Sequence, residues 1–377
     1  TRAEAIFFNR DPDPFGRGVE ERLEKMGARI GIAIRSFKDV AIHERDEVLT
    51  GAGDPFRVFT PYSKAWAKLP KPPIAMRISR IQSPSGIFSL PLPDNSTWDL
   101  ASAAGGVLEA GEKAARLRMQ AFLDSGLARY GAMRNLPAGR TTSRLSQDLR
   151  FGLISIRELH RATLDKMETL DAVGRDSAAT YVSELVWREF YMQVLWNFPG
   201  VLDEEFNAKY RGMVWPGKRE NFQRWCDGLT GFPIVDAAMR ELRETGFMHN
   251  RTRMITAMFL TKDLHLDWRM GEMWFMQTLA DGEIASNNGG WQWSAGTGAD
   301  AAPYFRIQNP WSQTKRFDSD GTYIKTWVPE LRNVDVAKLM DPPAPGMRLA
   351  PGYPSPIVDH SVARDITLDL FKSAAAR

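Results

Sequence analysis

The sequence predicts a mostly α protein, in which an all-helical domain follows the end of an α/β domain with a parallel sheet. First, residues 5–8 and 28–34 form apolar runs, and residues 17–26 between them have a helical pattern that ends at Gly27. Strand–helix–strand order is the unit from which parallel sheets are built. Second, six prolines between residues 69 and 97 mark an aperiodic linker. Third, the pattern from about Trp98 onward is helical almost throughout.

These observations divide the chain. Residues 1–65 are predicted to be the end of a Rossmann-like α/β domain, 66–100 a linker, 101–357 the helical domain and 358–377 a C-terminal tail. We expect the strand at 5–8 to be buried. Two strands are too few for a stable doubly wound sheet, and the sequence starts without Met. We therefore expect this domain to be truncated, with earlier strands outside the sequence.

The helical domain shows several separate elements. Apolar residues at i, i+4 and i+8 predict that residues 233–244 bury one helix face, with Gly246 as the C-cap. The proline-rich stretch 341–356 is predicted to be irregular. The other predicted helices cover residues 111–128, 177–196 and 250–262.

Composition excludes several classes of protein. The chain has 377 residues, a net charge of +3 and one cysteine, Cys226, so an intramolecular disulfide, a cysteine-ligated zinc site and an iron–sulfur cluster are excluded. The five histidines never fall at i, i+4, and no metal site is expected. No apolar run approaches the roughly 20 residues of a membrane helix, and we find no signal peptide. We therefore expect a cytoplasmic protein with no membrane partner.

Tryptophan is concentrated in one part of the chain. Ten of the 12 tryptophans lie between residues 187 and 327, close to many arginines. Aromatic residues usually pack in cores, but this density also favours a planar ligand or unstacked bases.

Four segments carry polar groups in suggestive patterns. Glu184, Trp187, Arg188 and Tyr191 share one helix face, which forms either a surface ion pair beside a packed tryptophan or the floor of a planar ligand site. The run 248–254 starts a helix with arginines that suit phosphate, or is an ordinary solvated first turn.

The other two segments are 281–293 and 142–146. Residues 281–293 combine two acids, two asparagines and two glycines between tryptophans, a composition that packing alone explains poorly. The hydroxyls of residues 142–146 suit a diphosphate, although Ser and Thr are also common N-caps.

Together these segments resemble the DNA photolyase/cryptochrome family. The similarity runs from about Phe7 to about Arg332, and the run from Thr230-Gly231-Phe232-Pro233 to Phe305-Arg306 is very specific. The pattern looks most like a class I cyclobutane pyrimidine dimer photolyase, a deoxyribodipyrimidine photo-lyase.

The resemblance implies that the helical domain binds FAD. Arg253 and Asp281 would form a salt bridge beside the flavin, and Glu283 stands where the family often has Asp. Asn287 matches the residue whose amide faces the flavin, where plant-type cryptochromes tend to have Asp and animal ones Cys. It favours a photolyase that holds fully reduced, anionic FAD. The residues that the resemblance assigns to FAD are Tyr130, Thr142, Ser143, Arg144, Leu145, Ser146, Arg253, Asp281, Gly282, Glu283 and Asn287.

The resemblance also assigns electron transfer and DNA contacts. Trp291, then Trp268, then Trp215 at the surface match the family's electron-transfer chain, and Glu184 matches the acid that hydrogen-bonds the pyrimidine. With Glu184 and Asn287, these tryptophans are the predicted catalytic residues. The predicted contacts to the lesion and its DNA are Glu184, Trp187, Arg188, Tyr191, Asn250, Arg251, Met254, Trp293, Arg306, Gln313 and Arg134.

The implied activity is light-driven repair. Excited reduced FAD would pass one electron to a flipped-out dimer in UV-damaged DNA, the cyclobutane would open, and the electron would return. The protein would be a monomer, associated with the bacterial nucleoid when bound to DNA. A cryptochrome-like photoreceptor without repair activity is the alternative, and a flavin-free relic is a third possibility. The antenna chromophore stays open. A (6-4) photolyase is disfavoured because the histidine pair that it needs near Asn250 and Met254 is absent.

Overall fold

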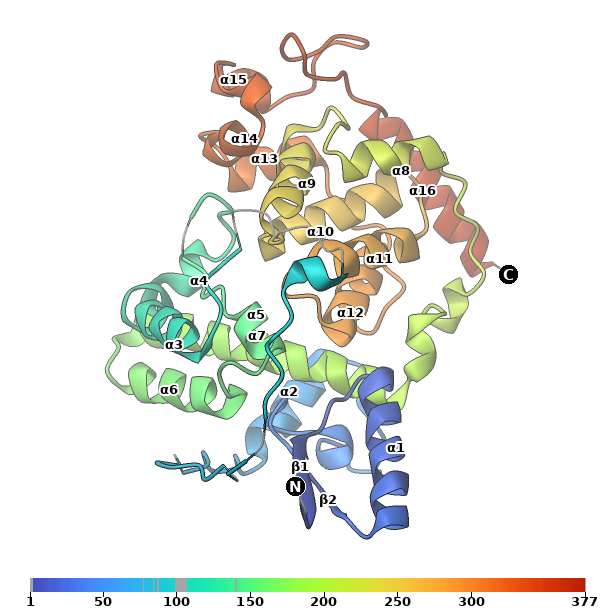
Figure 1. The fold of residues 1–377 in the computed structure, drawn as a ribbon. Helices are drawn as coiled ribbons and strands as arrows, with labels where there is room; N and C mark the ends of the chain where they lie inside the picture. The colour runs from blue at the N-terminus through green and yellow to red at the C-terminus, as the bar shows by residue number, and fades with distance from the viewer. Residues whose placement is uncertain are drawn as a thin grey trace.

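The computed structural model describes residues 3–76, 78–83, 85–86, 88–98, 107–139 and 141–376. Its N-terminal part is a small α/β unit, which lies at the bottom of Figure 1. Strands β1 (Ala5–Asn9) and β2 (Ala33–Phe37) pair in parallel, in register from Ala5↔Ala33 to Asn9↔Phe37. Helix α1 (Pro14–Ile30) connects them. The predicted strand–helix–strand unit is therefore confirmed.

Two details of this unit differ from the prediction. Gly27 does not end α1: it is buried inside the helix, where a side-chain carbon would lie 2.6 Å from Ile34 Cγ1. The helix ends instead at Gly31, whose φ of 72° forms the left-handed cap, so β2 begins at residue 33 rather than 28. The strand β1 is not buried either. Phe7 is 65% exposed and stacks on Phe37. Ile34 packs against α1 on one face of the sheet, and Phe7 is exposed because it lies on the opposite face.

A buried glutamate joins this unit to the helical body. Helix α2 (Phe59–Lys68) packs against α7 (Ala172–Asn197), and residues 66–68, predicted as linker, are its last turn. Trp66 Nε1 donates to Glu189 of α7 at 2.6 Å, and the backbone N–H groups of Ile42 and His43 donate to the same carboxylate at 2.5 and 3.1 Å. Burial raises the pKa of Glu189, and these three donors oppose that rise.

The body is helical, as predicted. Besides α2 and α7, it contains α3 (Glu112–Ala121), α4 (Tyr130–Met133), α5 (Ser146–Arg150), α6 (Ile156–Glu168), α8 (Arg219–Cys226), α9 (Pro233–Thr245), α10 (Asn250–Met258), α11 (Trp268–Thr278), α12 (Ile284–Ala295), α13 (Pro310–Phe317), α14 (Thr322–Trp327), α15 (Val336–Leu339) and α16 (His360–Ala375). Short 3₁₀ or π turns cover Arg45–Glu47, Asn95–Trp98, Phe122–Gly126, Leu127–Arg129, Pro199–Leu202, Ala208–Tyr210, Phe259–Asp263 and Pro329–Leu331. No helix among the described residues is both long and apolar enough to cross a membrane.

Three predicted helices differ in extent. The predicted helix 111–128 is α3 followed by a π turn and a 3₁₀ turn, and the predicted helix 250–262 is α10 followed by a π turn. Helix α7 begins five residues earlier than predicted, because Asp171 caps it by accepting from Gly174 N at 2.8 Å.

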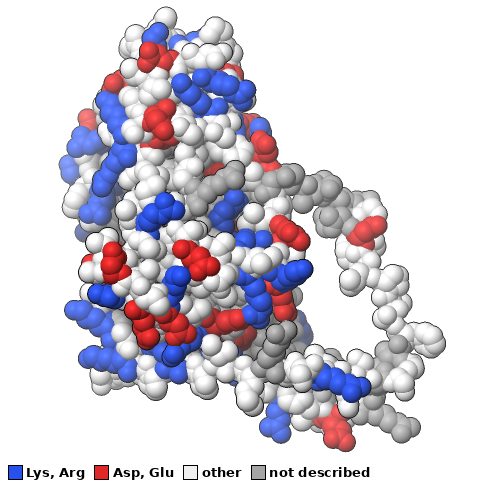
Figure 2. All heavy atoms as spheres, turned by 90° about the vertical axis from the view of Figure 1, so that its left-hand side faces the viewer, with Lys and Arg blue, Asp and Glu red and all other residues white. Residues whose placement is uncertain are grey.

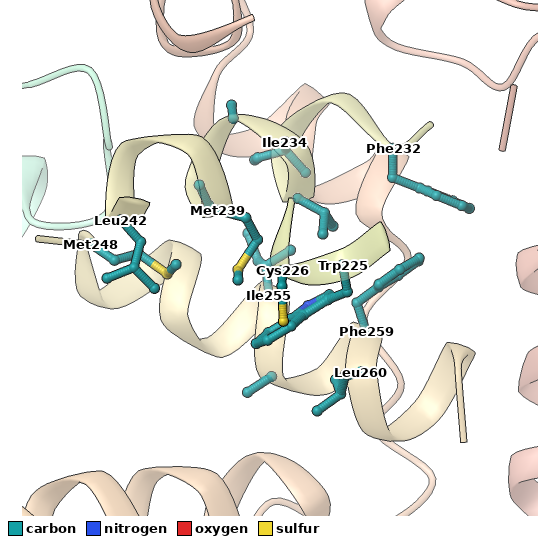
Figure 3. Close-up of a cluster of buried hydrophobic side chains, with 14 of the residues drawn as sticks. Trp225, Cys226, Phe232, Ile234, Met239, Leu242, Met248, Ile255, Phe259 and Leu260 are labelled. Atoms are coloured by element: carbon teal, nitrogen blue, oxygen red, sulfur yellow. The ribbon is translucent and has the colours of Figure 1, made fainter. Parts of the chain in front are cut away.

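The helices enclose two large apolar cores. One lies along α7 and includes residues of α2, α3 and α6. The other is centred on α8, α9 and α10 and includes Trp225, Ile234 and Phe259, the last in the π turn after α10; Figure 3 shows all three in this cluster. The segments that the sequence singles out contribute residues to both cores, such as Leu145 to the first and Trp291 to the second.

The segment predicted as a C-terminal tail contains a packed helix. Helix α16 begins after its N-cap Asp359, and Phe371 is 1% exposed against Tyr210. At the opposite end of α16, His360 Nδ1 lies 2.5 Å from Asp263 Oδ1. Figure 1 shows α16 lying along the side of the helical body.

Residues 230–240, the start of the very specific sequence run, are built around Asp236. Its carboxylate is fully buried and accepts from Thr230 N (2.8 Å), Thr230 Oγ1 (2.6 Å), Gly231 N (2.9 Å) and Tyr353 Oη (2.5 Å). Gly231 is required in this turn because its φ is 80° and a side-chain carbon would lie 2.5 Å from the backbone of Ser355. Asp236 thus fixes the start of α9 and ties it to the chain near residue 353.

We expect Asp236→Asn to destabilise the protein by about 2–4 kcal/mol, because an amide has one acceptor oxygen and would set its NH₂ group against donors. Urea unfolding followed by circular dichroism measures this loss. The matched control is Asp227→Asn, whose carboxylate is 35% exposed and should lose less than about 0.5 kcal/mol. Equal losses in both variants would contradict this role for Asp236.

Candidate functional site

A partly buried ion pair connects α10 to the loop before α12. Arg253 Nη2 donates to Asp281 Oδ1 at 3.0 Å and Oδ2 at 2.8 Å, while its Nε donates to Met248 O at 2.8 Å. The Asp281 side chain is 4% exposed and that of Arg253 26% exposed. The Arg253–Asp281 pair that the resemblance implies is therefore formed.

The 142–146 segment lies beside this pair. The Arg144 guanidinium lies 4.1 Å from the centre of the Phe247 ring, and that of Arg253 lies 5.8 Å from the same ring. Arg144 has a φ of 51°, in the left-handed region, so the backbone turns sharply just before α5. Leu145 is buried behind this turn. Two arginines from distant segments thus converge on one aromatic ring.

Glu241 is a site residue that the sequence analysis did not single out. It accepts a hydrogen bond from Tyr323 Oη at 2.5 Å, and burial raises the pKa of its carboxyl to about 7, opposed by this hydrogen bond and by Arg144 and Arg253. Its signal in the sequence was an acid inside the apolar stripe of residues 233–244.

Tyr130 belongs to an aromatic group on the other side of the segment. Its ring lies 5.9 Å from Phe122 and 5.1 Å from Tyr181, and the residue is 9% exposed. Ser143 lies close to the Tyr181 hydroxyl, so the group extends to the 142–146 turn.

The start of α12 brings three predicted residues together. Both Glu283 oxygens accept from this helix, from Ala285 N and Ser286 N at 2.9 Å each, so the carboxylate is an N-cap. The carbonyl of Gly282 accepts from Arg150 Nε at 2.9 Å, which joins this loop to α5. Asn287 Nδ2 donates to Glu272 O at 3.0 Å, and its side chain is half-buried.

The two adjacent glycines of α12 have different surroundings. A side-chain carbon at Gly289 would lie 2.1 Å from Tyr191 Cδ1, so this glycine lets α12 approach α7 closely. A side-chain carbon at Gly290 would meet no described atom within 4 Å. Gly290 therefore borders open space next to Trp291, where a ligand can approach the backbone.

We expect Gly290→Ala to lower the FAD content of the purified protein at least about threefold if FAD occupies this space. The apoprotein should stay as stable or gain up to about 1 kcal/mol, because alanine favours the helix. Flavin absorbance per chain and apoprotein thermal unfolding measure the two effects. Gly289→Ala is the comparison, since its clash with Tyr191 should destabilise the apoprotein itself. Full FAD content in Gly290→Ala would place the cofactor elsewhere.

The residues predicted to face the lesion form one cluster and several separate positions. Glu184 of α7 pairs with Arg134, which follows α4. Arg251 donates to Asn135 Oδ1 at 2.6 Å and contacts Met254 Sδ at 3.6 Å. The cluster thus joins α4, α7 and α10.

Trp187 and Tyr191 continue along α7. The Trp187 ring stacks on Phe59 at 3.7 Å and lies 5.5 Å from Tyr191. Arg188 points toward the α/β unit instead, where its Nη1 donates to Val40 O at 2.6 Å. Burial lowers the pKa of Arg188, against the opposing effect of Glu283 and Glu189. The structure does not place Arg188 with the Glu184 cluster.

The remaining predicted contacts lie near the surface. Asn250 and Arg306 are exposed, while Trp293 and Gln313 are half-buried. Figure 2 shows that basic and acidic side chains are interspersed on the face that lies on the left in Figure 1.

The three predicted electron-transfer tryptophans belong to the core around α11. Trp291 is 2% exposed, lies 5.0 Å from Phe275, and packs so closely on Gly271 that a side-chain carbon there would lie 2.0 Å from it. Trp268 is fully buried, and its Nε1 donates to Glu205 Oε1 at 3.2 Å. Trp215 is half-buried against the same core. Trp225, which the sequence analysis did not assign, also contacts Trp291 at 6.0 Å.

Comparison with known proteins identifies the family. Residues 1–78 match the family model described as DNA photolyase, and residues 181–373 match the FAD binding domain of DNA photolyase. The chain is 42% identical to a deoxyribodipyrimidine photo-lyase of Synechococcus sp., over 96% of this chain and 76% of that protein.

Solved structures give the same result. A bacterial class III photolyase from Agrobacterium tumefaciens superposes with a TM-score of 0.87 at 34% identity, over 100% of this chain and 80% of that one. A cryptochrome from Synechocystis sp. superposes with a TM-score of 0.87 at 29% identity, over 98% of this chain and 79% of that one. The chain therefore belongs to the DNA photolyase and cryptochrome family.

Proposed function

We propose that this protein is a deoxyribodipyrimidine photo-lyase, which binds FAD between the 142–146 turn and Asn287 and repairs cyclobutane pyrimidine dimers in light. The observation that carries the proposal is the convergence of Arg144 and Arg253 on Phe247, beside the Arg253–Asp281 pair. Cations and backbone N–H groups at such a turn suit a diphosphate. Bound in its reduced, anionic form, FAD supplies the light-excited electron for the reaction.

The residues of this chain fit that cofactor. Arg253 holds its position through Met248 O and Asp281, so its guanidinium is oriented before a ligand binds. Gly290 leaves room at the backbone of α12, and the half-buried Asn287 amide is fixed by Glu272 O. Tyr130 and Tyr181 offer apolar surface on the side of the 142–146 turn.

The lesion side would hold an extruded dimer. Photolyases take the target out of the base stack, and a damaged base costs less to extrude. An aromatic face repays roughly 1–3 kcal/mol per stacked base, and the half-buried Trp187 and Trp293, which the resemblance assigns to the lesion, would supply it. Glu184, held by Arg134, would bind the pyrimidine edge, and Arg251 would supply salt-dependent phosphate affinity.

A photoreceptor without repair activity is the second candidate, because the chain superposes equally well on a cryptochrome. The two functions make different demands on the Glu184 cluster. Repair requires the Glu184 cluster to act on a dimer that accepts an electron. A receptor that only binds DNA does not require this of the cluster.

The experiment is light-dependent repair of an irradiated thymine oligonucleotide by the protein with reduced FAD, compared in light and dark. Light should restore thymines. Glu184→Ala should lower the repair yield at least about tenfold, which corresponds to a loss of about 1.4 kcal/mol in stabilisation of the reacting dimer, while the FAD content stays unchanged. Glu204→Ala is the control, because that carboxylate is 57% exposed.

Binding of the irradiated oligonucleotide without repair in light would favour the photoreceptor. An equal loss of repair and FAD in Glu184→Ala would show that Glu184 holds the cofactor site together and does not act on the lesion. A colourless protein that takes up no added FAD would refute the proposal.

A further inference from the structure

A cavity of about 400 Å³ lies outside the site described above, between the α/β unit, the chain after α2 and helix α6. It is lined by Ile42, residues 71–74, Arg157, His160, Arg161 and Leu164. We propose that this cavity binds a small organic anion with a flat apolar body, such as an aromatic carboxylate. The proposal does not depend on FAD or on DNA repair.

The size and the apolar wall suit such a ligand. Pockets for small molecules usually have volumes of about 300–1,000 Å³ and are mainly apolar, with a few polar groups that fix the orientation. Here Ile42 is buried in the wall, while Ile74 and Leu164 are 47% and 36% exposed at it. Prolines 72 and 73 add rigid apolar surface. A flat body would cover side chains that otherwise face water.

Lys71 supplies the first charge. Its Nζ donates to Trp66 O at 2.5 Å and Leu69 O at 2.9 Å and lies 3.7 Å from the centre of the Trp66 ring. An ammonium group has three N–H donors, so these contacts hold Nζ in place and leave one donor. Burial lowers the pKa of Lys71 to about 8, with Glu189 opposing, so the group is mostly charged at pH 7.

Two arginines of α6 supply further charge. Arg157 Nη2 donates to Asp39 at 2.8 Å, but its buried Nε has no hydrogen-bond partner in the described part of the chain. Arg161 pairs with Asp165, and both side chains are more than half exposed. Both guanidinium groups line the cavity, and guanidinium groups favour an anionic ligand.

The charge of the lining selects against a cation. None of the described residues that line the cavity is acidic. Burial and Lys71 lower the pKa of His160 to about 4, so its ring is neutral at pH 7 and offers a flat face and a polar nitrogen. The nearby acids Asp39 and Asp165 are paired with the arginines. A carboxylate on an aromatic body fits the cavity better than a neutral or cationic ligand.

The test compares two ligands of nearly the same shape, the anion 2-naphthoate and the neutral 2-naphthamide, by calorimetric titration of the FAD-containing protein at pH 7. We expect one naphthoate per chain, bound at least about tenfold tighter than naphthamide, the ratio that one charge-assisted hydrogen bond supplies. Lys71→Met should remove most of this preference without changing naphthamide binding.

Two further variants complete the experiment. Arg161→Gln, at an exposed position, should weaken naphthoate binding. It replaces Lys71→Met as the test variant if Lys71→Met folds poorly. The FAD content and the thermal unfolding of Lys71→Met show whether it folds. Lys68→Met, on the exposed side of α2, is the control and should change nothing. Three results would overturn the proposal: equal affinity for the two ligands, no binding of naphthoate at millimolar concentration, or an unchanged preference for naphthoate in both Lys71→Met and Arg161→Gln. Light-dependent repair should be the same in all these variants.

Discussion

Trp291→Phe is expected to slow bleaching of the flavin bands under blue light with a thiol by at least about tenfold, a barrier increase of about 1.4 kcal/mol or more. Trp291 follows Gly290, which borders the proposed cofactor space, and packs on Gly271 of α11, the helix that begins at the buried Trp268. Phenylalanine keeps an aromatic ring in contact with Phe275 but is harder to oxidise than indole. Electrons from the surface then lack the first step of their route.

The same variant should leave repair by protein reduced beforehand largely intact, since the lesion receives its electron directly from the cofactor. The flavin absorbance, recorded during illumination with blue light, measures the rate of bleaching, and the oligonucleotide assay measures repair. The control is Trp225→Phe, an equally buried tryptophan that contacts Trp291 but lies outside the predicted chain. If both variants bleach equally slowly, the route is not the one proposed here.

Asp281→Asn is expected to release FAD during desalting and to destabilise the FAD-containing protein by about 3–5 kcal/mol. The substitution removes a carboxylate that is 4% exposed and leaves the Arg253 charge without its partner. Arg253 would then lose its orientation beside Phe247 and the 142–146 turn.

Flavin absorbance per chain before and after desalting measures this effect. Asp267→Asn is the control, because that carboxylate is 35% exposed and also pairs with an arginine, Arg269. Retention of FAD by Asp281→Asn at the level of Asp267→Asn would show that the Arg253–Asp281 pair does not hold the cofactor.

Much of the fold could be predicted because its signals are local. The sequence shows both ends of α9, because Pro233 stands at its start and Gly246 follows its end. It also shows the apolar stripe between these two residues. Gly27 shows where local rules fail: a glycine can end a helix or allow close packing inside it, and the contact with Ile34 decides which. The exposure of Phe7 likewise depends on which layers cover the sheet, and a single strand does not show this.

The site could be predicted only in part. The Arg253–Asp281 pair came from motif resemblance, and the structure forms it. Helical spacing put Arg188 on one face with Glu184, and the resemblance assigned it to the DNA contacts. A face of α7 is wide enough, however, for Arg188 to reach Val40 while Glu184 reaches Arg134. Glu241 has a signal in the sequence, an acid inside the apolar stripe of residues 233–244, but the sequence does not show that it meets Tyr323. Trp225 has no signal that separates it from the other tryptophans.

The absorption spectrum of the protein as purified, before and after blue light with a thiol, tests the central claim most directly. We expect the bands of one FAD per chain, which bleach in light to the reduced form. A protein that binds no flavin even when FAD is added, or flavin bands that free FAD in the same buffer reproduces in position and bleaching rate, would contradict the claim that the 142–146 turn, the Arg253–Asp281 pair and α12 enclose the cofactor.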